Sequence, residues 1–292
     1  GDAMTAKFGP AGNSDAFYEA GNKATLQIPG YLESLGLTAY EYQCGRGVTV
    51  GEETARKLGA KAAEHGITLS LHAPYYISLS SVEPEKREAS IGYLLASARA
   101  LDWMGGSRVI LHSGSCGKMS REQALSLACE TLARARAALD EAGYAHIVLC
   151  PETMGKINQL GTLEEVLTLC ELDERMLPCI DFGHLNARTL GAVRTQEDYA
   201  AILDAVEQRL GKERARSFHS HFSKIEYTAG GEKRHLTFAT DTGFGPDFEP
   251  LARLVVQRGL SPTIICESAG TQDLDALAMQ QTLKQIEEEM AS

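Results

Sequence analysis

Short apolar runs alternate along this chain with longer segments in which apolar residues recur every third or fourth position. The short runs predict buried β-strands, and the longer segments predict amphipathic helices that cover them. We expect strands at residues 5–8, 38–43, 67–72, 108–112, 147–152, 177–181, 215–221 and 263–267. A regular succession of strand and helix over this length predicts the α/β class and a closed (β/α)8 barrel.

The helices are expected to lie between the strands and to cover the outside of the barrel. They are predicted at residues 23–35, 51–65, 85–104, 120–142, 162–172, 196–210, 249–258 and 273–290. Ser120 with Gln123, and Thr162 with Glu165, have the spacing of capping boxes at two of the helix starts. No long run of Gly, Pro or Ser interrupts the pattern, so residues 1–292 are expected to form a single domain. Residues 223–247 form a long polar segment, which we interpret as a functional loop.

Six of the apolar runs end in a residue that can bind a metal ion. They are ITLSLH to His72, RVILH to His112, HIVLCPE to Glu152, LPCID to Asp181, ARSFH to His219 and TIICE to Glu267. The carboxyl ends of barrel strands meet at one mouth, so the six side chains are expected to converge there. Three imidazoles and three carboxylates predict a site for more than one divalent ion, with zinc or manganese as the candidates.

Further histidines adjoin this set. His184 follows Asp181 by three residues, a spacing that lets both side chains face one pocket if the chain turns there into a loop or helix. His219 and His221 are two residues apart and therefore share one face of a strand. We favour His219 as the metal ligand and His221 as a supporting or substrate contact, and the reverse assignment stays open.

Candidates for substrate contacts lie in the predicted loops. Arg46 and Lys224 can reach phosphate groups, although a solvated surface charge is the commoner role for such residues. Tyr75 follows His72 closely and can stack on a base or pack on a neighbouring loop.

Composition limits the classes of function. The net charge of −11 argues against a protein that coats nucleic acid broadly, but bound metal ions can supply local positive charge. The seven cysteines are scattered without a CxxC pair, which predicts a reducing, cytoplasmic location. No apolar run is long enough for a membrane span, no signal peptide is recognised, and no protein partner is implied. Residues 1–3, before Met4, are interpreted as remaining from expression.

The strings SLHAPY, LHSGS, PETMGKINQLG, CIDFGH, HSHFSK and ICES, in this order, resemble the endonuclease IV family over nearly the whole chain. Members are metal-dependent apurinic/apyrimidinic endonucleases on a TIM barrel. The resemblance implies a hydrolase with three zinc ions that cuts the phosphodiester 5′ of abasic sites, with DNA bearing abasic sites or damaged 3′ ends as its partner. The implied ligands are His72, His112 and Glu152 for one ion, Glu152, Asp181, His219 and Glu267 for the second, and His184 and His235 for the third.

Within this resemblance, Glu152 is the bridging and catalytically essential carboxylate, and Tyr75 matches the family's loop tyrosine. The chain also departs from the family. An Asp is usual two residues before the last histidine ligand, but Lys233 stands there and the nearest carboxylate is Glu232. Whether the site binds two or three metal ions therefore stays open. Residues 43–48 differ from the family's DNA-penetrating loop, although Arg46 could take the role of that loop.

A second hypothesis comes from the wider xylose isomerase-like superfamily, which includes sugar isomerases and epimerases with one manganese ion. Their sites resemble Glu152, Asp181, His219 and Glu267, with His184 as a substrate contact. That hypothesis leaves His72 and His112 without a chemical role, so it ranks second. A barrel that binds a ligand without turnover is a third possibility, and it leaves costly buried carboxylates unused.

Overall fold

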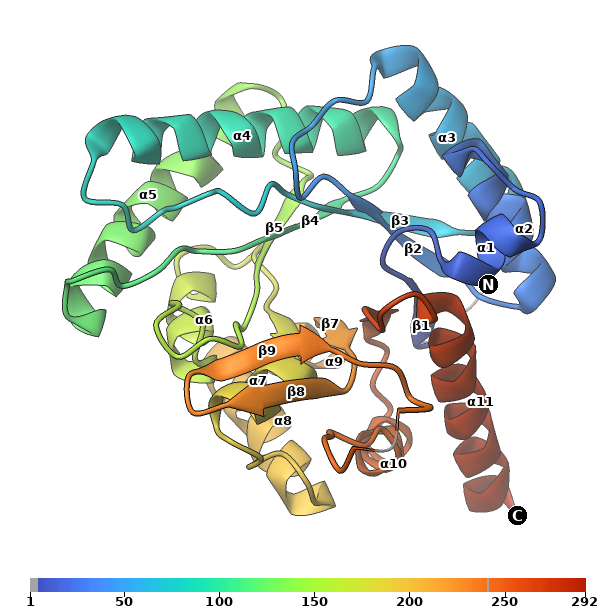
Figure 1. Ribbon diagram of the computed structural model, residues 1–292. Coiled ribbons are helices and arrows are strands. Elements are labelled where there is room, and N and C mark those ends of the chain that lie inside the picture. Colours follow the sequence, from blue (N-terminus) through green and yellow to red (C-terminus); the bar gives the residue numbers. More distant parts are fainter. Residues whose placement is uncertain (1–4, 241) are drawn as a thin grey trace.

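Eight parallel β-strands stand in a ring in the computed structural model, which describes residues 5–240 and 242–292 (Figure 1). They are β1 (Lys7–Pro10), β2 (Ala39–Gln43), β3 (Thr68–His72), β4 (Arg108–Leu111), β5 (Val148–Pro151), β6 (Cys179–Asp181), β7 (His219–Phe222) and β10 (Thr263–Cys266). Strands β2 to β5 pair in order, and so do β6, β7, β10 and β1. Parallel bridges from Ala11 to Glu41 and from Glu152 to Cys179 join the two sheets at both seams. The predicted (β/α)8 barrel is confirmed.

Helices surround the ring (Figure 1). They are α1 (Asp15–Glu19), α2 (Ile28–Leu35), α3 (Glu52–His65), α4 (Pro84–Trp103), α5 (Arg121–Glu141), α6 (Leu163–Cys170), α7 (Phe182–Arg188), α8 (Gln196–Leu210), α9 (Lys212–Arg216), α10 (Glu249–Gln257) and α11 (Gln272–Ala291). Both predicted capping boxes are present, at Ser120 before α5 and at Thr162 before α6. None of the helices in the described ranges is long and apolar enough to cross a membrane.

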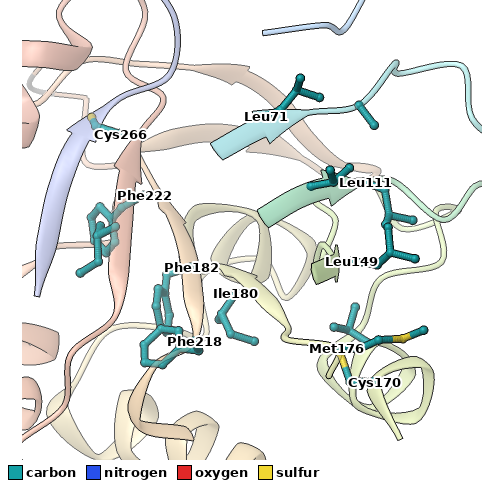
Figure 2. Close-up of a cluster of buried hydrophobic side chains, with 14 of the residues drawn as sticks. Leu71, Leu111, Leu149, Cys170, Met176, Ile180, Phe182, Phe218, Phe222 and Cys266 are labelled. Carbon is teal, nitrogen blue, oxygen red and sulfur yellow. The ribbon is translucent and has the colours of Figure 1, made fainter. Parts of the chain in front are cut away.

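Alternation along the strands separates an outer core from a small inner one. Leu71, Leu111 and Leu149 lie on successive strands and are fully buried in the outer core (Figure 2). Cys150, next to Leu149, belongs to a separate cluster with Ile110 and Cys179. Neighbouring residues of a strand face opposite sides of a sheet, so this second cluster lies inside the ring. It lines the side of the interior formed by β4, β5 and β6, beneath Glu152.

The seam between β1 and β2 depends on a glycine. A Cβ atom on Gly9 would lie 1.6 Å from the carbonyl oxygen of Ala39 on the neighbouring strand. Any side chain at this position would therefore push the two strands apart. Gly9 lets β1 approach β2 closely enough to close the barrel there.

One predicted strand was wrong at its start. Residues 215–221 were expected to form the seventh strand, but α9 extends to Arg216 and β7 begins only at His219. Ala215 and Phe218 are apolar residues that are buried, and their apolar character led us to predict that the strand begins at residue 215. His219 therefore opens β7 instead of ending it, and His221 is the histidine nearer the mouth. The other predicted strands begin and end within two residues of the observed bounds.

Besides α9, three other local features were not predicted. Helix α1 follows Ser14, and α7 begins directly after Asp181. The segment 223–247, expected to be a loop, contains an antiparallel hairpin of β8 (Ile225–Thr228) and β9 (Gly231–His235). The start of β9 bridges to Lys156 in the segment after β5. This contact holds the hairpin beside the mouth of the barrel.

Candidate metal centre

Glu152 lies at the centre of the polar residues at the mouth. It follows β5 directly and is only 1 % exposed. Its Oε1 atom is 3.1 Å from Nε2 of His72 at the end of β3, and 3.1 Å from Nε2 of His112 just after β4. His72, His112 and Glu152 form what we call the histidine pocket, a three-ligand set of the kind that binds zinc.

The second oxygen of Glu152 belongs to a neighbouring group. Nδ1 of His221 lies 3.0 Å from Glu152 Oε2, 3.2 Å from Glu267 Oε1 and 3.8 Å from Asp181 Oδ2. We call Glu152, Asp181, His221 and Glu267 the carboxylate pocket. Because Glu152 offers one oxygen to each pocket, it can bridge two cations. The side chains that the strand-end pattern singled out, apart from His219, meet in these two pockets.

A third group, the hairpin pocket, joins α7 to the β8–β9 hairpin. It consists of His184, Glu232 and His235. Glu232 Oε2 lies 3.4 Å from His184 Nε2 and 3.1 Å from His235 Nε2. His184 is in turn 3.1 Å from Asp181 through its Nδ1 atom, so the hairpin pocket adjoins the carboxylate pocket.

A β-bulge gives Glu232 its place in the hairpin pocket. Residues three apart on a regular strand face opposite sides, so Glu232 and His235 would be separated. In the hairpin Glu226 pairs with Arg234 and Tyr227 pairs with Glu232, so Lys233 is an extra, unpaired residue of β9. The bulge turns Glu232 to the same side as His235. Lys233 takes the position where the family pattern led us to expect a carboxylate, and Glu232 faces His184 and His235 instead.

The hydrogen bonds of the histidines leave one ring nitrogen of each free to face a carboxylate. Nδ1 of His72 lies 2.8 Å from the Ala73 carbonyl oxygen, and Nδ1 of His184 lies 2.8 Å from the Thr153 carbonyl oxygen. Nδ1 of His235 is 2.7 Å from the Ser223 hydroxyl. When the proton of a neutral imidazole is held on Nδ1, Nε2 carries the lone pair that can bind a metal ion.

The hydrogen bonds at the mouth do not satisfy all of the carboxylate oxygens there. Among the described residues, no donor makes a well-directed hydrogen bond to the buried Oδ2 of Asp181 or Oε1 of Glu267, although Nδ1 of His184 and Nδ1 of His221 lie 3.1 and 3.2 Å from them. Burial, opposed by His184 and reinforced by the charges of Glu267 and Glu152, raises the pKa of Asp181 to about 8. Burial also acts to raise the pKa of Glu152, but His221 and His112 hold it well below its usual range. A divalent cation would satisfy both unpaired oxygens, so the donor set fits bound metal.

The preference for His219 over His221 does not agree with these positions. His219 lies deeper in the ring, where its Nε2 atom is 2.8 Å from Glu41 Oε1, and His221 occupies the carboxylate pocket. Sequence reasoning also missed Glu41, a fully buried carboxylate in the middle of β2. An acidic residue inside an apolar strand was the available signal for it.

The expected substrate contacts are only partly brought together. The ring of Tyr75 stacks on His112 with 5.4 Å between centroids, and 52 % of Tyr75 is exposed. A Cβ atom on Gly45 would lie 2.1 Å from that ring, so glycine is needed for this close approach. Arg46 is exposed in the same turn. Lys224 points elsewhere, towards Asp247 at 3.8 Å, and is not part of the three pockets.

Comparisons with known proteins identify the family of the chain. The model of the xylose isomerase-like TIM barrel family matches residues 30–291. The uncharacterized protein MJ0133 of Methanocaldococcus jannaschii is 37% identical over 237 residues, which cover 81% of this chain and 84% of that protein. The probable endonuclease 4 of Shouchella clausii is 27% identical over 222 residues, 72% of this chain and 73% of its own length. The resemblance to endonuclease IV is confirmed at the level of relatives.

Solved structures share the fold at lower identity. Endonuclease IV from Thermus thermophilus superposes with a TM-score of 0.67 at 21% identity, covering 97% of this chain and 99% of that chain. A D-tagatose 3-epimerase-like protein gives 0.71 at 16% identity, covering 98% of this chain and 100% of that chain. Both support the barrel, and neither decides between the two chemistries.

Proposed function

The chain belongs to the xylose isomerase-like TIM barrel family, and we propose that it is a zinc-dependent phosphodiester hydrolase that cuts DNA 5′ of abasic sites. The observation that carries the proposal is that His72 and His112 meet Glu152 beside the carboxylate pocket. Two pockets that share one carboxylate suit a pair of ions, and paired ions are typical of phosphodiester hydrolysis. Relatives named probable endonuclease 4 support the same reaction.

The proposed ligands follow the pockets. One ion would be held by His72, His112 and Glu152, and the second by the carboxylate pocket, with His221 contributing Nδ1. When bound, such ions polarise a phosphodiester and lower the pKa of a water molecule, and manganese is the alternative to zinc. Glu152 orients both pockets at once, because its two oxygens face different histidines.

Residues around the mouth are proposed to receive the DNA. Half of Tyr75 is exposed beside His112, where its ring can stack on the exposed sugar or on a neighbouring base. Arg46 lies in the adjoining turn and can contact a phosphate. The net charge of −11 makes these contacts and the bound cations the sources of attraction for DNA.

A third ion is proposed for the hairpin pocket, with Glu232 in place of the Asp that the family pattern led us to expect. Glu232→Gln should remove about one ion per chain from the metal content measured by mass spectrometry. Lys233→Ala is the matched control, because Lys233 lies next to Glu232 but pairs with Glu226 at 3.2 Å. Equal metal content in Glu232→Gln and wild type would count against the third ion.

The function is tested by incision of a labelled duplex that carries one synthetic abasic site. We expect cleavage on the 5′ side by zinc-loaded protein, none after EDTA treatment, and loss of cleavage in His112→Ala. His146→Ala is the control histidine, because His146 pairs with Asp102 away from the mouth at 2.6 Å. Failure of demonstrably metal-loaded protein to cut would overturn the proposal.

A sugar epimerase is the second candidate. In its favour, the carboxylate pocket alone makes a four-ligand site for one ion with two glutamates, and an epimerase-like structure shares the fold. This function predicts turnover of ketoses by manganese-loaded protein that survives His112→Ala. Loss of all activity in that variant would exclude it, because its chemistry does not use His72 or His112.

A further inference from the structure

A polar network lies inside the barrel, one layer below the carboxylate pocket. Its centre is Glu41 of β2, which is fully buried. Glu41 Oε1 accepts hydrogen bonds from the Ser70 hydroxyl at 2.9 Å and from His219 Nε2 at 2.8 Å. Its Oε2 atom accepts from His221 Nε2 at 2.5 Å. Both oxygens of Glu41 are therefore occupied by donors, which come from β3, the neighbour of β2, and from β7 on the opposite side of the ring from β3.

His221 connects this network to the mouth. Its Nε2 atom faces Glu41, and its Nδ1 atom faces Glu152 and Glu267. An imidazole that donates from Nε2 to a carboxylate carries a lone pair on Nδ1 when it is neutral. Without metal, a proton on Nδ1 can be donated to Glu152 at 3.0 Å and faces Glu267 at 3.2 Å. A cation bound between these atoms takes the place of that proton and uses the Nδ1 lone pair. The contact with Glu41 thus decides which nitrogen of His221 is offered to that cation.

Glu41, His219 and His221 are also close enough to hold an ion themselves, but the surroundings argue against one. The Arg108 guanidinium lies 3.3 Å from Nδ1 of His219 and is anchored by a 2.7 Å bond to the Ser217 carbonyl oxygen. It brings a positive charge to this end of the network. Because Arg108 donates to Nδ1, His219 must carry its proton on Nε2 and donate it to Glu41. The network is complete without a metal ion.

We propose that Glu41 is a positioning residue that fixes the ring orientation and the Nε2-protonated form of His221, so that Nδ1 faces the carboxylate pocket. Ser70 and His219 hold Glu41 in place. Carboxylates that accept a hydrogen bond from a metal-binding histidine commonly contribute roughly 10- to 100-fold to metal affinity, and an effect of this size is expected here. The inference rests on the proposed metal centre, but it does not depend on which substrate that centre acts on.

Glu41→Gln is the decisive variant. A glutamine has one acceptor oxygen and one amide that only donates, so its two ends cannot both accept, one from His219 and one from His221. One histidine must lose its partner or move its proton. We expect the zinc dissociation constant, measured by competition with a chelator, to rise about 10- to 100-fold. Glu165→Gln is the matched control, because it makes the same change at a buried carboxylate that binds Arg121 on the outside of the barrel, and its zinc affinity should stay close to that of wild type.

Two outcomes overturn the proposal. The first is a Glu41→Gln protein that folds and binds zinc as tightly as wild type, which would make Glu41 a purely structural residue. The second comes from wild type alone and covers the case in which the variant does not fold. Nitrogen-15 spectra of histidine-labelled, zinc-loaded protein should show a protonated Nε2 and a metal-bound Nδ1 for His221, and the opposite pattern would refute the role. Absence of DNA incision by zinc-loaded wild type would instead count against the proposed function, and it would leave the expected difference in zinc affinity between wild type and Glu41→Gln intact.

Discussion

Two buried carboxylates at helix starts behave in opposite ways. Asp181 caps α7 at the mouth, where its Oδ1 atom accepts from the His184 amide at 2.8 Å. Glu165 completes the capping box of α6 on the outside of the barrel, where its Oε1 atom accepts from the Gly161 and Thr162 amides at 3.0 Å. Both sites share the same local interaction, since at each an acidic side chain accepts hydrogen bonds from free backbone amides at the start of a helix.

Their remaining interactions differ. Glu165 is bound by Arg121 at 2.7 and 2.9 Å. Burial opposes the charge of Glu165, but Arg121 and the two amides lower its pKa to about 2. Oδ2 of Asp181 has no hydrogen-bond partner among the described residues, and the pKa of Asp181 rises to about 8. A carboxylate that the fold satisfies contributes to stability, and one that the fold leaves unsatisfied in a buried place indicates where a cation binds.

The largest effect is expected at the carboxylate shared by two pockets. Glu152→Gln keeps the shape but removes the charge that faces His112 and His221, so we expect turnover to fall at least ~1,000-fold, about 4 kcal/mol. Steady-state incision kinetics measure the loss, and circular dichroism checks the fold. Glu165→Gln should leave turnover unchanged. Near-wild-type turnover of pure Glu152→Gln would remove Glu152 from the site.

Asp181→Asn should separate activity from stability. Asparagine still caps α7, and it replaces a carboxyl whose pKa of about 8 keeps it mostly protonated at neutral pH in the metal-free protein. We expect turnover to fall by roughly 100-fold, about 2.7 kcal/mol. The metal-free variant should unfold at the same or a higher urea concentration than metal-free wild type. A clear loss of stability would show that Asp181 is a structural carboxylate like Glu165.

The strand-end rule explains how much of this site could be predicted from the sequence. His72, Asp181 and Glu267 were found because each closes an apolar run, and parallel strands of a barrel bring such positions together. The same rule failed at His219, because the buried residues Ala215 and Phe218 made the predicted strand begin too early, in the region that forms α9. The strand bounds were wrong there, and they favoured His219, whereas His221 is the histidine that lies in the carboxylate pocket.

Residues missed by the rule are those placed by tertiary geometry. Glu41 lies in the middle of β2, and its partners His219 and His221 are 178 and 180 residues away in the chain. Glu232 owes its direction to the bulge at Lys233, which a strict alternation of strand faces does not anticipate. A single sequence identifies side chains at regular positions, and irregular backbone has to be observed.

Metal binding should be stronger at higher pH, which tests the charge state of Asp181 directly. The pKa of Asp181 is raised to about 8, so the proton is bound at pH 7 and must leave when a cation binds. Without metal, the stabilisation linked to this proton is present below the ordinary pKa of 3.8 and is lost as the pH rises through 8. We expect zinc affinity to increase between about pH 6 and 8. A free zinc concentration of roughly 100 times the dissociation constant should raise the free energy of unfolding by about 2.7 kcal/mol.

Calorimetric zinc titrations in two buffers of different ionisation enthalpy count the released protons. At neutral pH wild type should release more protons per bound ion than Asp181→Asn, and the difference should shrink above pH 8 because Asp181 is then already ionised. The same number of protons for both proteins at neutral pH would contradict the raised pKa, and with it the contrast to Glu165.

The smallest effect is expected at Glu165, where the sign of the pH dependence is reversed. Glu165→Gln removes the charge that Arg121 binds, so the free energy of unfolding at neutral pH should fall by about 1–2 kcal/mol. The pKa of Glu165 is lowered to about 2, so its contribution is present above the ordinary value of 4.5 and is lost as the pH falls towards 2. Urea unfolding of both proteins should therefore show a gap that narrows as the solution is acidified below pH 4.5. A gap that does not change with pH would mean that the amide hydrogen bonds of the capping box, and not the ionised carboxylate, account for the stability at α6.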